Sequence, residues 1–127
     1  MDTVMLNWLR EGAVVRMPAV TAGGTPVRFL DYDPERYLIV LPSLPAAVIF
    51  YSVGDSRSIF PIVTLPAGTA PSVITEDYHG ELVRMPWYAW VGSGNPGFMP
   101  VALSYGADKQ RVRDEYIRRY LSNIGTL

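Results

Sequence analysis

The chain has 127 residues, of which 49% are hydrophobic and only 18% charged, with a formal net charge of −1 and no cysteine. This length suits one domain with a core of its own and is too short for two. The absence of cysteine excludes disulfides, thiolate metal sites and a cysteine nucleophile, and the near-zero net charge excludes a global field that would attract nucleic acid or anionic lipid. Because soluble domains are usually about 25% charged, the low charge indicates apolar area that neighbouring subunits cover.

The first predicted element is a short N-terminal helix within residues 1–11. Asp2 or Thr3 can cap this helix, and Gly12 can end it. No basic region precedes an apolar run in this segment, so we expect no signal peptide.

Residues 13–105 are predicted to form a β region of about eight short strands. Runs of β-branched and aromatic residues are bounded by Gly, Pro, Asn and Asp, which is typical of strands joined by turns. In chain order the runs are AVVRMPAV, VRFLDY, YLIVL, AVIFY, IFPIV, SVIT, ELVRMPWYAWV and MPVALSY. Between them, EDYHG is predicted as a turn and GSGNPG as a loop.

Two long stretches of this region, 37–54 and 58–75, contain no charged residue. Both approach the length of a membrane-spanning helix, but each is interrupted by prolines, which remove a backbone donor and clash with a helical turn. We therefore expect buried strands that need cover on both faces, no membrane insertion, and a virion or cytoplasmic location. The interrupting prolines are Pro42, Pro45, Pro61, Pro66 and Pro71.

A second helix is predicted over residues 108–124. Asp108 can cap it and Gly125 can end it, and the run between them contains neither Gly nor Pro. Apolar residues recur at every fourth position, which makes the helix amphipathic: Val112, Tyr116, Tyr120 and Ile124. Strands bracketed by two helices predict a mainly β single domain over 1–127, a small antiparallel barrel or sandwich.

The tetrapeptide VRMP occurs twice, at 15–18 and 83–86. In both copies a glycine lies three residues before the valine, and a Gly-x-Pro follows. Two interpretations stay open, namely duplicated hairpins near 12–30 and 80–103 or convergence on the same turn chemistry. A proline within a strand belongs at an edge or a bulge, so neither interpretation assigns the motif a catalytic role.

The sequence offers little for catalysis. His79 is the single histidine, and Asp77 lies two residues before it, so a Ser-His-Asp site stays open. However, the sequence contains no Gly-x-Ser-x-Gly elbow, and a lone histidine in a turn is usually a surface residue.

Two further patterns resemble ligand sites. Asp31, Asp33 and Glu35 occupy alternate positions, like the start of a calcium loop. That loop needs Gly at its sixth position and Glu at its twelfth, where this sequence has Arg36 and Pro42. The loop GSGNPG matches Gly-x-Gly-x-x-Gly, but its prolines prevent the helix that a dinucleotide site requires. We therefore predict no cofactor and no metal.

Aromatic and arginine side chains are the candidate interface residues. Trp87 and Trp90 are three positions apart, so in a strand they face opposite sides, one toward the core and one outward. An entirely buried aromatic group is the alternative, and for the basic helix residues a solvated, salt-bridged face is the alternative. The candidates are Trp87, Tyr88, Trp90, Phe98, Arg111, Arg118 and Arg119.

These features favour a non-enzymatic structural or interaction subunit of a larger protein assembly, with other protein subunits, identical or different, as partners and no nucleic acid. Small β-rich domains of this kind are common among bacteriophage virion proteins, such as capsid decoration, head–tail joining and tail proteins. A small hydrolase is a remaining alternative, although the sequence shows no paired-carboxylate motif.

A second alternative comes from a resemblance. The stretches GTPVRFLDYDPERYLIVLPSLP and PVALSYG resemble the N-terminal barrel of flagellar-brake proteins, which accompanies a PilZ domain that binds cyclic dinucleotides. The resemblance implies a regulatory ligand-binding β-barrel. The Arg-x-x-x-Arg signature of the PilZ half does not occur in this sequence, and a long insertion separates the two similar stretches.

Overall fold

The computed structural model describes residues 13–54, 60–106, 114–115 and 117–119. In space the chain divides into one unit of Val15–Leu103 and a second unit of Met1–Val14 with Ser104–Leu127. In the second unit, the described residues 114–115 and 117–119 are helical, as the helix predicted over 108–124 requires. The helix predicted over 1–11 lies outside the described residues.

The regular secondary structure of the described residues consists mainly of short strands. They are β1 (Val14–Arg16), β2 (Val20–Thr21), β3 (Val27–Leu30), β4 (Arg36–Leu41), β5 (Ile49–Val53), β6 (Val63–Leu65), β7 (Ser72–Thr75), β8 (Trp87–Val91), β9 (Gly97–Phe98) and β10 (Val101–Ser104). Between β7 and β8 lie a single helical turn, α2 (Glu76–His79), and a 3₁₀ helix, η1 (Gly80–Arg84).

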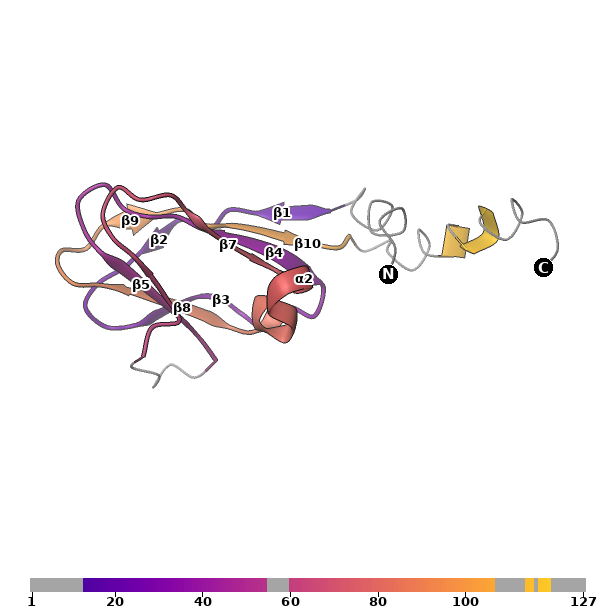
Figure 1. The fold of residues 1–127 in the computed structure, drawn as a ribbon, viewed down its shortest axis with the longest axis horizontal. Helices are drawn as coiled ribbons and strands as arrows, with labels where there is room; N and C mark the ends of the chain where they lie inside the picture. Colours follow the sequence, from indigo (N-terminus) through magenta and orange to yellow (C-terminus); the bar gives the residue numbers. More distant parts are fainter. Residues whose placement is uncertain (1–12, 55–59, 107–113, 116, 120–127) are drawn as a thin grey trace. The chain divides into compact units, whose positions relative to one another are not determined.

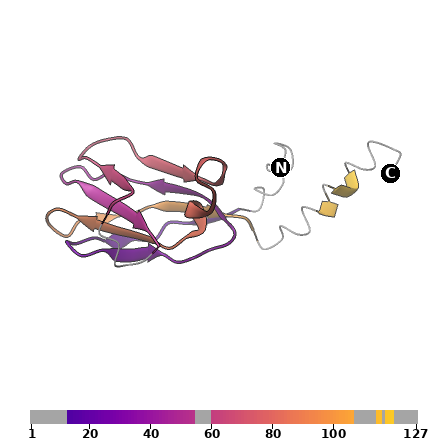
Figure 2. The same cartoon turned by 60° about the horizontal axis from the view of Figure 1, so that its bottom comes forward.

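The strands form three antiparallel sheets. Sheet A has the order β1-β10-β4-β7, sheet B pairs β2 with β9, and sheet C has the order β3-β8-β5-β6. Figures 1 and 2 show sheets A and C as two layers, with α2 at one end. This arrangement confirms the predicted mainly β class and is that of a small sandwich, because the sheets of the described residues do not close into a barrel. No helix among the described residues has the length and apolar character needed to cross a bilayer.

The core lies between sheets A and C. Alternate residues of the central strands point into it, as the period of a strand requires. Ile39 and Leu41 of β4 are fully buried, as are Tyr51 of β5 and Trp87 of β8. Phe29 and Phe98 join this core through edge-to-face ring contacts with Tyr51, with centroids 5.8 Å and 6.0 Å away.

The two VRMP segments do not each fold back on themselves. The strands of 14–30 pair instead with those of 87–104: β1 lies beside β10, β2 beside β9 and β3 beside β8. Val20 lies opposite Phe98, so continuing this antiparallel register by two residues places Pro18 opposite Pro100. Neither proline can donate a ladder hydrogen bond, which explains why both strands break at this rung. Whether the repeat arose by duplication stays a prediction.

The segment 76–84 differs from the prediction. EDYHG was expected to be a turn and ELVRMPWYAWV a strand, but residues 76–84 form α2 and η1, and the strand begins only at Trp87. Thr75 caps α2, because its Oγ1 accepts a hydrogen bond from the Tyr78 amide at 3.3 Å. The turn that follows buries Val83 completely within the core cluster, which alternation within a strand does not predict.

Candidate functional site

Arg36, at the start of β4, is almost completely buried, with 3% of its surface exposed. Its Nε donates to the Val83 carbonyl at 2.7 Å, its Nη1 to the Asp31 carbonyl at 3.0 Å and its Nη2 to the Met85 carbonyl at 2.7 Å. Burial lowers the pKa of the guanidinium, and the nearby Asp33 and Asp31 charges partly oppose this effect. Arg36 therefore joins β4 to the segment after η1, and its donors are turned to backbone carbonyls rather than to solvent.

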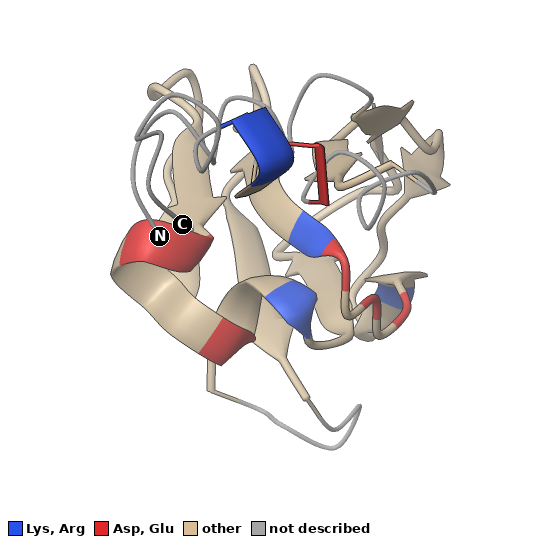
Figure 3. Ribbon diagram, turned by 90° about the vertical axis from the view of Figure 1, so that its right-hand side faces the viewer, with Lys and Arg blue, Asp and Glu red and all other residues tan. Residues whose placement is uncertain are grey.

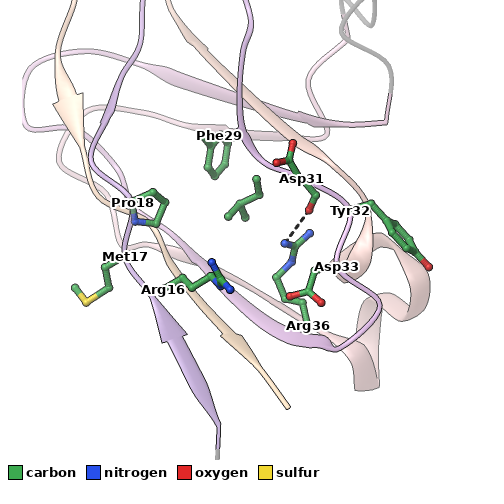
Figure 4. Close-up of a pocket in the computed structure, with 9 residues that line it drawn as sticks. Arg16, Met17, Pro18, Phe29, Asp31, Tyr32, Asp33 and Arg36 are labelled. Atoms are coloured by element: carbon green, nitrogen blue, oxygen red, sulfur yellow. Dashed lines mark hydrogen bonds between the residues drawn. The ribbon is translucent and has the colours of Figure 1, made fainter. Parts of the chain in front are cut away.

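A pocket of about 570 Å³ lies beside Arg36. Figure 4 shows Phe29 and Pro18 on one side of it, and Arg16, Asp33 and Arg36 on the other. Tyr32 lines the pocket, although its ring is directed away from the other labelled side chains. The volume lies within the range of small-ligand sites, and the lining combines an apolar wall with a charged one.

The charges of this pocket largely offset each other. Arg16 makes no hydrogen bond or ion pair with any other described residue, so its guanidinium is available to an anionic group. Asp31 and Asp33 oppose that positive charge, and Asp31 is paired with Arg28 at 3.4 Å. The lining contains no Ser, Thr, His or Lys. The pocket can hold a small amphipathic group, but its residues do not form a nucleophile–base pair.

The outer face of sheet A is aliphatic. On β4 and β10, Ile39 and Ala102 belong to the core, so their neighbours along each strand point to the opposite face. On β7, Val73 lies opposite Val40. On β1, continuing the β2–β9 register places Val15 opposite Leu103 and Arg16 opposite the core residue Ala102. The aliphatic residues of this outer face are Val15, Leu38, Val40, Val73, Val101 and Leu103, and Thr75, opposite Leu38, lies on the same face.

These side chains are incompletely covered. Val15 is 57% exposed and Val73 is 47% exposed, while the other four are half-buried. None of the six belongs to the core cluster or to the partly buried residues packed against it. Figure 3 shows red and blue on α2, η1 and the loop before β4, whereas the strands are mostly tan. Sheet A is thus apolar on both faces, unlike the usual half-polar antiparallel sheet.

The outer face of sheet C is aromatic instead. Phe50 of β5 stacks on Trp90 of β8, with ring centroids 5.6 Å apart and an interplanar angle of 22°. On the same face, the Arg28 guanidinium lies 5.5 Å from the ring centre of Tyr88 and donates to its hydroxyl at 2.8 Å. This hydrogen bond is the main reason why the pKa of Arg28 is raised. The aromatic rings therefore cover one another on sheet C, in contrast to the open face of sheet A.

The edge strands of both sheets are short and bounded by prolines. In sheet A, the edge strand β1 is followed by Pro18 and the edge strand β7 is preceded by Pro71. In sheet C, Pro26 precedes β3, and Pro66 follows β6. Short, proline-bounded edges disfavour the addition of a further strand.

The structure separates the predicted interface residues. Trp87 is fully buried in this chain's own core and Trp90 lies on the outer face of sheet C, which confirms the predicted alternation. Tyr88 and Phe98 are also buried, with 2% and 8% of their surfaces exposed. On the C-terminal helix, Arg118 and Arg119 are exposed and lie 3.9 Å and 2.7 Å from the Glu115 carboxylate. Arg111 lies outside the described residues.

His79 contributes to local structure. Its Nδ1 accepts a hydrogen bond from the Thr75 amide at 3.1 Å, which closes the single turn of α2. Asp77 is exposed on the same turn. The histidine is therefore part of the cap that begins the helical segment.

The two patterns that resembled ligand sites are turns. Asp33 accepts a hydrogen bond from the Glu35 amide at 2.9 Å, which is an Asx turn ahead of β4. Among the described residues, no three His, Asp or Glu side chains gather as a metal site would require. The loop GSGNPG contains Gly94 at a φ of 75°, a conformation that favours glycine, and it leads into strand β9.

The signal for the outer face of sheet A was present in the sequence. YLIVL is apolar at every position, which indicates a strand covered on both faces. The six residues of the outer face were nevertheless not predicted individually, because their strands are distant in the sequence and only the strand order brings them together.

The described strands form a small antiparallel β-sandwich. No protein-family model matches the chain, and no curated protein shows significant sequence similarity to it. Among solved structures, the chain is similar to a subunit from Bacillus endospore appendages, described as a novel family of disulfide-linked pili. The identity is 11% and the TM-score 0.42, over 74% of this chain and 88% of the other. A score this low does not establish a common fold, and this chain has no cysteine with which to form disulfide links.

Proposed function

We propose that this protein is a non-enzymatic structural or interaction subunit of a larger protein assembly. The observation that carries the proposal is the outer face of sheet A, where aliphatic side chains on four adjacent strands belong neither to the core cluster nor to the residues packed against it. Leaving such a face in water is unfavourable, by about 25 cal/mol for each square ångström of apolar surface. A contiguous apolar patch of this kind is typical of a protein–protein contact.

The charge distribution supports the same role. With a net charge of −1, the chain has no excess of basic residues that would favour nucleic acid, so we propose protein partners. The mechanism is shape-complementary packing of apolar surface, with the charged residues at its margin giving orientation.

A more specific form of this proposal, called the finer proposal below, is that the assembly is a bacteriophage virion. The protein would then be a capsid decoration, head–tail joining or tail protein. Its support is an analogy of class: the chain is short, β-rich, low in charge and apolar on an outer sheet face. A virion repeats one contact many times, so a small apolar face on each subunit suffices to hold it in place.

The absence of an enzymatic role is part of the proposal. Its support is that His79 is engaged in the cap of α2 and that the pocket beside Arg36 contains no nucleophile–base pair. Arg36 itself bonds backbone carbonyls and has no reacting group in reach.

Velocity sedimentation of an extract from the producing cells, followed by detection of this chain, tests the proposal. We expect the chain in a fast-sedimenting particle, and in density-gradient-purified virions if the finer proposal holds. Sedimentation of all of the chain as a free monomer in such extracts would contradict an assembly role. Its presence in a particle that is not a virion would contradict only the finer proposal.

A further inference from the structure

We propose that the outer face of sheet A binds the same face of a second copy of this chain. The inference rests on the assembly role proposed above and names the partner of that surface. Two copies related by a twofold axis would place the six aliphatic residues against their own counterparts.

The lack of charged residues on this face is compatible with a second copy as the partner. A twofold contact brings each residue near its equivalent or near another residue of the same patch, so a charge on the patch would meet a like charge. None of the six residues is charged. Arg36, which alternation along β4 would place with Leu38 and Val40, is buried and bonded to three carbonyls, so its charge is not presented at this face.

The shape of the face also suits a sheet partner. The β4–β7 pairing is regular over four consecutive residue pairs, from Leu38 opposite Thr75 to Leu41 opposite Ser72. Two sheets with the same twist pack face to face at about 10 Å, and aliphatic side chains of this size fill that space.

The alternative way to join two sandwiches is to extend a sheet through its edge. Here β1 and β7, the edges of sheet A, have three and four residues and are bounded by Pro18 and Pro71. Such edges offer few free backbone groups and cannot extend far. The face is therefore the better contact.

The area of the outer face of sheet A limits the expected affinity of the dimer. Six partly exposed aliphatic side chains can bury at most about 400 Å² per copy, or about 800 Å² in total, which is the size of a weak contact. We therefore expect purified protein to dimerise reversibly, with a dissociation constant on the order of 100 µM, and to need repetition in an assembly for stable binding.

Sedimentation equilibrium of the full chain from about 10 µM to 1 mM tests this inference. We expect the apparent mass to rise toward twice the monomer mass. Val73→Glu and Val15→Glu, at opposite edges of the face, should each weaken dimerisation on the order of tenfold or more, because each buries an unpaired charge in an apolar contact. Tyr78→Glu is the matched control, since Tyr78 is 90% exposed on α2, outside the face, and should dimerise as the wild type does.

Circular dichroism and thermal unfolding establish that each variant folds. If a glutamate variant does not fold, Val73→Thr keeps the β-branched shape and should weaken dimerisation about threefold. A concentration series of amide NMR spectra gives an independent result, with shifts expected on β1, β10, β4 and β7. A wild-type monomer at 1 mM, shifts confined to sheet C, or equal weakening by Val73→Glu and Tyr78→Glu would overturn the inference.

These outcomes are separate from the test of the proposed function. A chain that is monomeric when pure but sediments with a large particle in the extract would overturn self-pairing and leave the assembly role standing. In that case the face is not covered by a second copy of this chain.

Discussion

Arg36 and Val83 are joined by a hydrogen bond of 2.7 Å from the guanidinium Nε to the backbone carbonyl, although 47 positions separate them in the chain. The same guanidinium bonds Met85, so Arg36 binds the backbone of the second VRMP segment. Arg84 of that segment bonds the Pro34 carbonyl at 3.2 Å and the Glu76 carboxylate at 3.0 Å. The second VRMP segment is thus a structural junction, whereas Arg16 of the first lines the pocket.

Arg36→Met is expected to lower the free energy of unfolding by about 3 kcal/mol, because one buried and two partly buried carbonyls lose their donor. Urea unfolding measures this change. Arg16→Met is the matched control, since Arg16 has no partner among the described residues, and it should cost less than about 0.5 kcal/mol. Equal effects of the two substitutions would contradict the assignment of Arg36 as a junction.

Trp87→Ala is expected to cost about 4 kcal/mol, because Trp87 is fully buried and its Nε1 donates to the Leu82 carbonyl at 2.9 Å. Trp90→Ala should cost about 1–2 kcal/mol, since it removes a half-buried ring stacked on Phe50. Thermal and urea unfolding of the two variants measure the difference. The reverse order would mean that the faces of β8 are wrongly assigned.

The stability of the protein should fall at alkaline pH partly through Tyr51. Burial raises the pKa of its hydroxyl, which donates to the Pro42 carbonyl at 2.6 Å. Above about pH 10 the unfolded chain loses this proton while the folded chain keeps it, so the free energy of unfolding decreases as pH rises. Below that pH the stabilisation is fully present.

Tyr51→Phe isolates this contribution. The variant should be less stable than the wild type by about 1 kcal/mol at pH 7, because the Pro42 carbonyl loses its donor. Urea unfolding at a series of pH values should show the difference between the two proteins shrinking above pH 10. A difference that is constant up to pH 11 would show that Tyr51 does not contribute to the alkaline loss.

His79→Ala should lower the free energy of unfolding by about 1 kcal/mol or less, because it removes one acceptor from the cap of α2. Thr75→Ala, which removes the Oγ1 acceptor of the Tyr78 amide, should have a similar effect of about 1 kcal/mol. Unfolding curves and an assay of particle assembly measure the two consequences. If His79→Ala alone abolished a biological activity in a folded protein, the non-enzymatic proposal would be wrong.

Much of the fold could be predicted because strand signals are local. The run VRFL and the apolar run YLIVL both became strands, and Gly and Pro mark most of the boundaries. The period of two along a strand placed Trp87 and Trp90 on opposite faces without any knowledge of the partner strands. Low charge and two uncharged stretches also indicated apolar surface beyond the core.

Segment 76–84 shows where local signals were insufficient. Its residues have strand-forming neighbours, but the segment is helical because Val83 is buried in the core and Arg36 bonds the carbonyls that follow. Both interactions involve residues far away in the chain, which a local pattern does not contain.

The sequence alone therefore determined most of the strand segments, the prolines that bound them, and the low share of charged residues, which is 18%. Only the tertiary structure decided which strands are neighbours, and hence that Val15, Val40 and Val73 share one open face while the aromatic residues of β5 and β8 cover each other. The physical reason is that alternation fixes the two sides of each strand, but strand order and long-range packing decide which side meets the core.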